Sequence, residues 1–185
     1  MKKVIALLIT VCFVVFLSAK EIGGIDIEKV KNYDNHKLVL NGAGIRSKFF
    51  FDLYVGSLYL TQYCIQGEKV ANEDKPMAIT LHIISSMITS KKMKNAIVEG
   101  FEKSTDGNFD SLKSNIDKFI SFFSKKIQKG DIFEIVYLPN VGTKVIKNQK
   151  LVGIIKGLSF KQALFKIWIG KKPAQESLKK AMLTP

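Results

Sequence analysis

Two runs in the first half of the chain have the composition of β-strands. Residues 45–61 combine aromatic and aliphatic side chains without a proline, and residues 77–85 repeat this pattern after a polar loop that contains Pro76. The preceding segment, NGAG at residues 41–44, has the glycines that a tight turn with positive φ requires. The pattern therefore predicts a turn at 41–44, one long strand over 45–61 and a second strand over 77–85.

From Thr89 onward, apolar residues recur every three to four positions, which is the spacing of one helix face. A first helix is predicted through Phe101. A second is predicted over residues 109–127, where Gly130 is placed to end it. The apolar positions are Met93, Ile97, Gly100 and Phe101, followed by Phe109, Leu112, Ile116, Phe119, Ile120, Phe123 and Ile127.

The last third of the chain predicts strands and then helices. Strand composition returns at residues 131–138, 143–147 and 151–156. Helix signals follow: Ser159 and Gln162 form a capping box, Gly170 ends that helix, and Pro173 opens a last one through Met182. This order has no regular βαβ alternation. It predicts an α+β fold in which a mainly antiparallel sheet is covered on one face by helices.

The N-terminus has the order of a secretory signal. Lys2 and Lys3 precede an apolar run from Val4 to Leu17, and Ser18-Ala19 follow. We predict a signal peptide over residues 1–19, cleaved after Ala19, and a single periplasmic or secreted domain over 20–185. An uncleaved anchor remains the alternative, because the run is only a few residues short of the roughly 20 that span a bilayer.

The chain is basic, with a formal net charge of +13 that comes mainly from scattered lysines. Solvated helix faces explain most such lysines, and peripheral contact with an anionic membrane surface is the further candidate. No nucleic-acid-binding motif is present, so we expect no nucleic-acid partner. Cys64 is the one cysteine outside the predicted leader, which excludes an internal disulfide.

Residues that could hold a metal or cofactor are sparse. His36, His82 and Cys64 lack the spacing of a transition-metal site. The glycines at 42 and 44 lead into a strand, whereas a phosphate-binding loop opens a helix. We therefore expect no metal and no cofactor.

The segments GAGIRSKFFFDLYVGSLYL (42–60) and FKQALFKIWIGKKPAQESLKKAML (160–183) resemble the chalcone isomerase-like family. The resemblance extends over residues 35–185. It implies an open-faced β-sandwich, in which a large antiparallel sheet has helices on one face and a cleft between the two layers. Plant enzymes of the family close a flavanone ring, while non-catalytic relatives bind fatty acids in the same cleft.

The resemblance assigns two ligand-binding residues. Arg46 matches the family arginine that holds the anionic substrate in the enzymes and the carboxylate in the lipid binders. Tyr54 falls where the enzymes have threonine and the lipid binders have tyrosine. On one straight strand these residues would stand about 26 Å apart, so they share a ligand only if the chain bends between them. An ion pair of Arg46 with an acid such as Asp52, and core packing of Tyr54, remain alternatives.

The same resemblance places Lys91 and Asn95 where the enzymes have the lysine and asparagine of a Tyr-x-x-Lys-x-x-x-Asn set. Ile88 replaces the tyrosine, and Ile167 replaces a polar residue that contacts substrate. Loss of these groups disfavours ring closure.

Three hypotheses follow. The preferred one is an exported, non-catalytic protein that binds a fatty acid or similar amphipathic carboxylate. The second is an isomerase, an intramolecular lyase acting on a chalcone-like enone. The third is an envelope protein-interaction module.

Overall fold

The computed structural model describes residues 20–184, so the predicted leader and its cleavage site lie outside the described residues. A seven-stranded sheet has the order β3-β4-β5-β6-β7-β8-β9, and every neighbouring pair is antiparallel. Its strands are β3 (Val30–Tyr33), β4 (His36–Lys48), β5 (Phe51–Leu60), β6 (Met77–Ile83), β7 (Ile132–Leu138), β8 (Gly142–Lys147) and β9 (Lys150–Ile155). A separate hairpin consists of β1 (Lys20–Ile22) and β2 (Ile25–Ile27).

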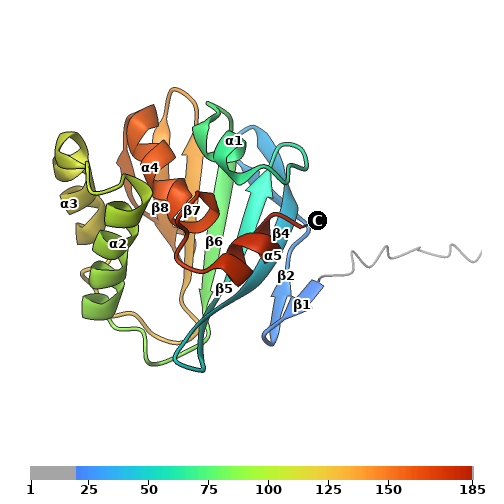
Figure 1. Ribbon diagram of the computed structural model, residues 1–185. Coiled ribbons are helices and arrows are strands. Elements are labelled where there is room, and N and C mark those ends of the chain that lie inside the picture. The colour runs from blue at the N-terminus through green and yellow to red at the C-terminus, as the bar shows by residue number, and fades with distance from the viewer. Residues whose placement is uncertain (1–19, 185) are drawn as a thin grey trace, which may run out of the picture.

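Within the described residues, five α-helices lie on one face of this sheet (Figure 1). They are α1 (Gly67–Asn72), α2 (Ser90–Ser104), α3 (Lys113–Ser121), α4 (Leu158–Ile169) and α5 (Glu176–Met182), with a short 3-10 turn at Asp110–Leu112 before α3. The main core fills the space between sheet and helices, and α4 contributes seven buried hydrophobic residues to it. The predicted α+β fold, with helices covering one face of an antiparallel sheet, is confirmed.

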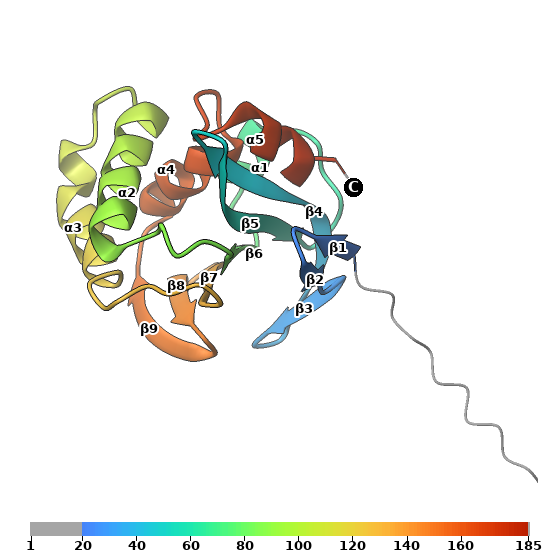
Figure 2. The same cartoon turned by 90° about the horizontal axis from the view of Figure 1, so that it is seen from below.

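The sheet is curled rather than flat. Figure 2 shows β3 at one edge and β9 at the other turning away from the helix layer. Three strands separate β3 from β7, yet Lys31 Nζ and the Tyr33 hydroxyl both donate to Glu134 Oε1, at 2.8 and 2.7 Å. This bridge closes the concave face over a second, smaller core that includes Val55 and Tyr59.

Two predictions for residues 41–61 are wrong. The NGAG segment is not a turn but part of β4, and residues 45–61 are not one strand but the two arms of a hairpin that turns at Phe49 and Phe50. The glycines serve close packing: a Cβ on Gly42 would collide with the carbonyl oxygens of Ala181 and Met182, at the C-terminal end of α5. Glycine lets this helix lie directly on the strand.

Helix ends also differ from prediction. The second helix ends at Ser121 rather than near Gly130, although the later residues Phe123 and Ile127 are still buried in the main core. Helix α4 follows Gly157 with no side-chain cap, so Ser159 and Gln162 do not form a capping box. The last helix starts at Glu176 rather than at Pro173. Helix α1 was not predicted.

Replacing a glycine under α5 with alanine is expected to lower the free energy of unfolding. The size of the loss depends on whether the new Cβ collides with backbone atoms or with a flexible side chain. For Gly42→Ala the obstacles are backbone oxygens, whereas for Gly56→Ala the nearest atom is the flexible Met182 Cε at 2.6 Å. Because backbone cannot move aside cheaply, Gly42→Ala should lower the free energy of unfolding by about 2–3 kcal/mol, and Gly56→Ala by about 1 kcal/mol. Urea denaturation measures both; equal costs would contradict the packing role of Gly42.

The pH dependence of stability is expected to include His82, which is half-buried on the concave face. Burial lowers the pKa of His82 below its usual 6.5; the charge of Lys31 adds to this effect, and Glu134 and Glu28 oppose it. The unfolded chain therefore takes up this proton at a higher pH than the folded chain. Stability should fall as the pH drops below 6.5 through the lowered folded pKa.

The measurement is the urea midpoint at pH 7.5 and pH 5 for wild type and His82→Gln. The variant should lose part of the acid sensitivity. His36→Gln is the control, because His36 is exposed on β4. An unchanged acid sensitivity in His82→Gln would show that other groups carry the effect.

Candidate functional site

The hairpin register brings Arg46 and Tyr54 together. They are directly opposed Cα partners on β4 and β5, so their side chains leave the same face of the sheet. That is the helix face, because Tyr54 belongs to the main core. The chain between them bends back through the Phe49-Phe50 turn. The condition for a shared ligand, a bend between the two residues, is therefore met.

Tyr54 is buried, and its hydroxyl oxygen accepts a hydrogen bond from Trp168 Nε1 at 3.0 Å. Burial raises the pKa of the Tyr54 phenol, while the Trp168 hydrogen bond and the positive charge of Arg46 act in the opposite direction. The phenol therefore stays neutral at physiological pH. Since its oxygen is used as an acceptor, its own hydrogen remains for a second partner.

Arg46 is half-buried and contacts the start of α5. Its Nη1 donates to Gln175 Oε1 at 2.8 Å and to the Ser47 carbonyl oxygen at 2.6 Å. The same Gln175 oxygen also accepts from the Ser47 backbone N–H at 2.9 Å. Asp52 instead accepts from the Ser47 hydroxyl at 2.7 Å, and no ion pair of Arg46 occurs within residues 20–184.

Gln175 thus places one neutral oxygen where two donors converge, one of them charged. A carboxylate oxygen fits the same position and would add the charge that the amide lacks. Sequence reasoning missed both Gln175 and the Trp168 hydrogen bond. Gln175 lies 129 residues from Arg46 along the chain, and its only sequence signal is its place just before the last helix.

Within residues 20–184, the weaker catalytic candidates form no hydrogen bond with Arg46 or Tyr54. Lys91 and Asn95 are exposed side chains on the first turns of α2, outside its buried face. Ile88 and Ile167 are buried in the main core, where Ile167 packs against the backbone of Gly100. Ile88 and Ile167 therefore contribute apolar side chains to the core and no hydrogen-bonding groups.

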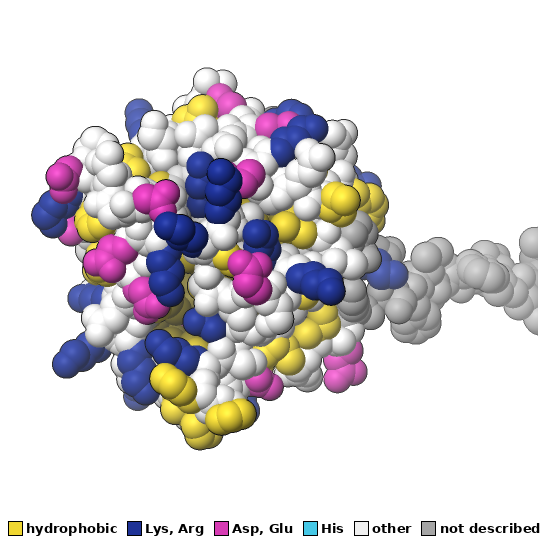
Figure 3. Space-filling view, in the orientation of Figure 1, with side chains coloured by type: hydrophobic (Ala, Val, Ile, Leu, Met, Phe, Trp, Pro, Cys, Tyr) yellow, Lys and Arg dark blue, Asp and Glu magenta, His cyan; other side chains and the backbone are white. Residues whose placement is uncertain are grey.

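The surface is hollowed between α2 and the β4–β5 hairpin, with hydrophobic side chains at the base and basic ones at the rim (Figure 3). The pKa of Glu99 on α2 is lowered, chiefly by its hydrogen bond from Lys103, and the positive charges of Lys48 and Arg46 on β4 add smaller effects.

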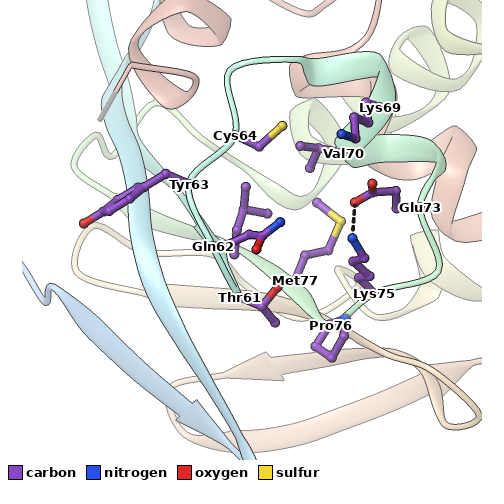
Figure 4. A pocket seen from close by; sticks show the side chains of 11 residues that line it. Thr61, Gln62, Tyr63, Cys64, Lys69, Val70, Glu73, Lys75, Pro76 and Met77 are labelled. Carbon is purple, nitrogen blue, oxygen red and sulfur yellow. Dashed lines mark ion pairs between the residues drawn. The ribbon is translucent and has the colours of Figure 1, made fainter.

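A separate cavity of about 90 Å³ lies beside Cys64, at the far end of β5 (Figure 4). Its walls include Val70 and Met77, and an ion pair of Lys75 with Glu73 at 3.3 Å spans one side. This volume holds only a few water molecules, well below the roughly 300 Å³ of a typical ligand pocket. It is also distant from Arg46, so it is not the predicted ligand cleft.

Within residues 20–184, no three His, Cys, Asp or Glu side chains gather in a way that could hold a metal ion. No helix in the same part of the chain has the length and apolar character needed to cross a bilayer.

Comparison with known families matches residues 19–184 to the family described as chalcone isomerase-like. The chain belongs to this family. Among solved structures, the chalcone isomerase-like fold is shared with a fatty-acid binding protein of Arabidopsis thaliana, at a TM-score of 0.67 and 17% sequence identity. The alignment covers 86% of this chain and 92% of that one. No curated protein sequence matches the chain.

The buried Tyr54–Trp168 contact should contribute measurably to stability. Tyr54→Phe leaves the buried indole N–H without an acceptor, which should lower the free energy of unfolding by about 1–3 kcal/mol. Trp168→Phe should cost less in the Tyr54→Phe background than in wild type. Denaturation of the four proteins in this cycle gives the coupling. Exposed Tyr63→Phe is the control, and additive costs would argue against the hydrogen bond.

Proposed function

We propose that this chalcone isomerase-like protein binds a fatty acid or a similar amphipathic carboxylate without transforming it. The observation that carries the proposal is the cross-strand pair of Arg46 and Tyr54, with Gln175 and Ser47 completing a set of polar groups at the edge of an apolar core. The fold shared with a fatty-acid binding protein supports this choice. The predicted leader suggests that the protein acts in the periplasm or outside the cell.

The head group would displace the Gln175 amide oxygen. The Arg46 guanidinium and the Ser47 N–H, which both donate to that oxygen, would then donate to the carboxylate. The Tyr54 hydroxyl is the third donor. A guanidinium keeps its charge in a partly apolar site, so it favours an ionised acid over a neutral lipid.

The alkyl tail would enter through the hollow between α2 and the hairpin. Beyond it, the main core already contains Met93, Ile97 and Trp168, which are buried. A long tail therefore has to take the place of side chains, which requires α2 to shift outward from the core. Each buried methylene contributes about 0.8 kcal/mol, so a long tail can offset that rearrangement whereas a short one cannot.

The hydrogen-bonding residues that the family's enzymes use for ring closure are incomplete in this chain, which argues against catalysis. Ile88 and Ile167 offer no side-chain hydrogen bonds, and Lys91 and Asn95 are exposed, outside the buried face of α2. The Arg46 site therefore has groups that hold an anion but lacks the further polar set that the enzymes use.

The test is a titration of the delipidated chain with oleic acid. Binding is measured by calorimetry and by the change in fluorescence of Trp168, the single tryptophan. Arg46→Ala should raise Kd for the acid about tenfold or more, because a charged hydrogen bond is lost. Oleyl alcohol, which lacks the carboxylate, should bind both proteins equally.

Two variants at one position sharpen the test. Gln175→Ala removes the competing amide and should tighten acid binding, whereas Gln175→Glu supplies a resident carboxylate to Arg46 and should weaken it. Absence of oleic acid binding to wild type, or equal binding to all four proteins, would overturn the proposal. Mass spectrometry of lipids that co-purify with the protein identifies the natural chain length.

A further inference from the structure

Three phenylalanines face solvent at the tip of the β4–β5 hairpin. Phe49, Phe50 and Phe51 are 78%, 105% and 54% exposed, and hydrophobic side chains gather there at the lower end of Figure 3. Phe49 and Phe50 also adopt φ angles of 50° and 67°. Two-residue turns of this kind favour asparagine and glycine, because bulky side chains are strained at positive φ. Folding alone therefore does not explain the sequence of this tip.

The antiparallel topology places four segments at the same end of the molecule: residues 47–52, 84–92, 124–131 and 147–150. Hydrogen bonds join them. The Ser90 hydroxyl donates to the carbonyl oxygens of Phe123 and Lys125, and Lys147 Nζ donates to the Lys126 carbonyl oxygen at 2.9 Å. The backbone N–H of Ile84 donates to Leu53 O at 3.0 Å, next to the hairpin. We call this surface the basic end.

Lysine dominates the basic end. Its four segments contain Lys48, Lys91, Lys92, Lys125, Lys126, Lys129, Lys147 and Lys150. Their acids are Asp52 and Asp131, and Asp131 is buried and paired with Lys147 at 2.7 Å. Residues 61–76, at the opposite end of the sheet, contain two lysines and three acids instead. The segments at the end of the sheet that carries the aromatic tip are therefore more basic than residues 61–76 at the opposite end.

We propose that the basic end docks on an anionic lipid bilayer, with Phe49 and Phe50 inserted at the boundary between head groups and acyl chains. Aromatic side chains at the end of a narrow loop reach this boundary, while lysines around them remain in the layer of anionic head groups. The interaction concerns the outer surface of the hairpin and does not depend on ligand binding at Arg46.

A bilayer fits this surface better than a second protein does. The apolar group is three side chains at a hairpin tip, which is small beside the roughly 800 Å² that each partner buries in a stable protein interface. A fluid surface needs no complementary pocket for the tip. The lysines of the basic end, apart from Lys147, which is paired with Asp131, match a surface of uniform negative charge.

The experiment is flotation of the chain from Lys20 onward with phosphatidylcholine vesicles, with or without one third phosphatidylglycerol. Wild type should float with the anionic vesicles and should dissociate as salt is raised. Phe49→Asn with Phe50→Gly suits the positive φ of the turn, so it should keep or raise thermal stability. It should also lower partitioning about tenfold or more, because the inserting aromatics are lost.

Matched controls test surface and charge separately. Tyr63→Ser with Ile65→Ser removes exposed apolar groups at the opposite end and should leave binding unchanged. Lys125→Gln with Lys126→Gln should weaken binding to anionic vesicles, whereas Lys171→Gln with Lys172→Gln, beside Asp106, should not. No flotation by wild type, or equal flotation by the Phe49/Phe50 variant, would overturn the proposal. Self-association of the protein through the hairpin tip, without binding to vesicles, would also overturn the proposal.

Oleic acid titration of the same variants in the absence of vesicles separates this proposal from ligand binding. The Phe49/Phe50 variant should bind the acid as wild type does. Arg46→Ala should still float with the anionic vesicles, since the tip and its lysines are intact.

Discussion

The close contact of α5 with β4 is the constraint on which the candidate site depends. Gly42 and Gly44 leave no side chain between the strand and the helix, and a Cβ on Gly44 would lie 2.6 Å from Ala181 Cβ. Asn41 fixes the far end of the helix, since its buried amide donates to the carbonyl oxygens of Met182 and Cys64, at 2.8 and 3.0 Å. The height and direction of α5 above the sheet are thereby set.

That placement determines the surroundings of Arg46. Gln175 is the residue immediately before α5, so the contact that the glycines permit also brings its amide onto the guanidinium. Gly42, Gly44 and Arg46 lie within five residues of one another on β4. The same strand therefore provides both the surface on which α5 packs and the cation beside the start of that helix. An amide satisfies hydrogen bonds without neutralising charge, so a half-buried Arg46 still gains from an anion.

The sequence predicted the parts of this fold whose patterns are local. Strands β6 to β9 follow from runs of strand-forming residues, the buried face of α2 follows from apolar residues every three to four positions, and the α+β class follows from the order of these elements. Prediction failed at residues 41–50, because glycines normally mark turns and phenylalanines normally mark strands, and this hairpin uses each in the other role. Arg46 and Tyr54 came from resemblance, whereas Gln175 and the Trp168 contact depend on packing between distant segments.

The proposed head-group site and the proposed membrane contact share one hairpin. The Lys48–Phe51 pair is only two residue pairs beyond Arg46–Tyr54, a rise of roughly 7 Å along the strands. With the phenylalanines at the base of the head-group layer, Arg46 would stand close to the depth at which carboxylates of membrane-bound acids reside. An acid could then pass between bilayer and protein without its charge crossing apolar surroundings, which is the costly step in moving an ionised lipid. The strained phenylalanines at positions 49 and 50 would therefore serve binding, because a tip of polar residues would not insert and would leave Arg46 farther from the bilayer.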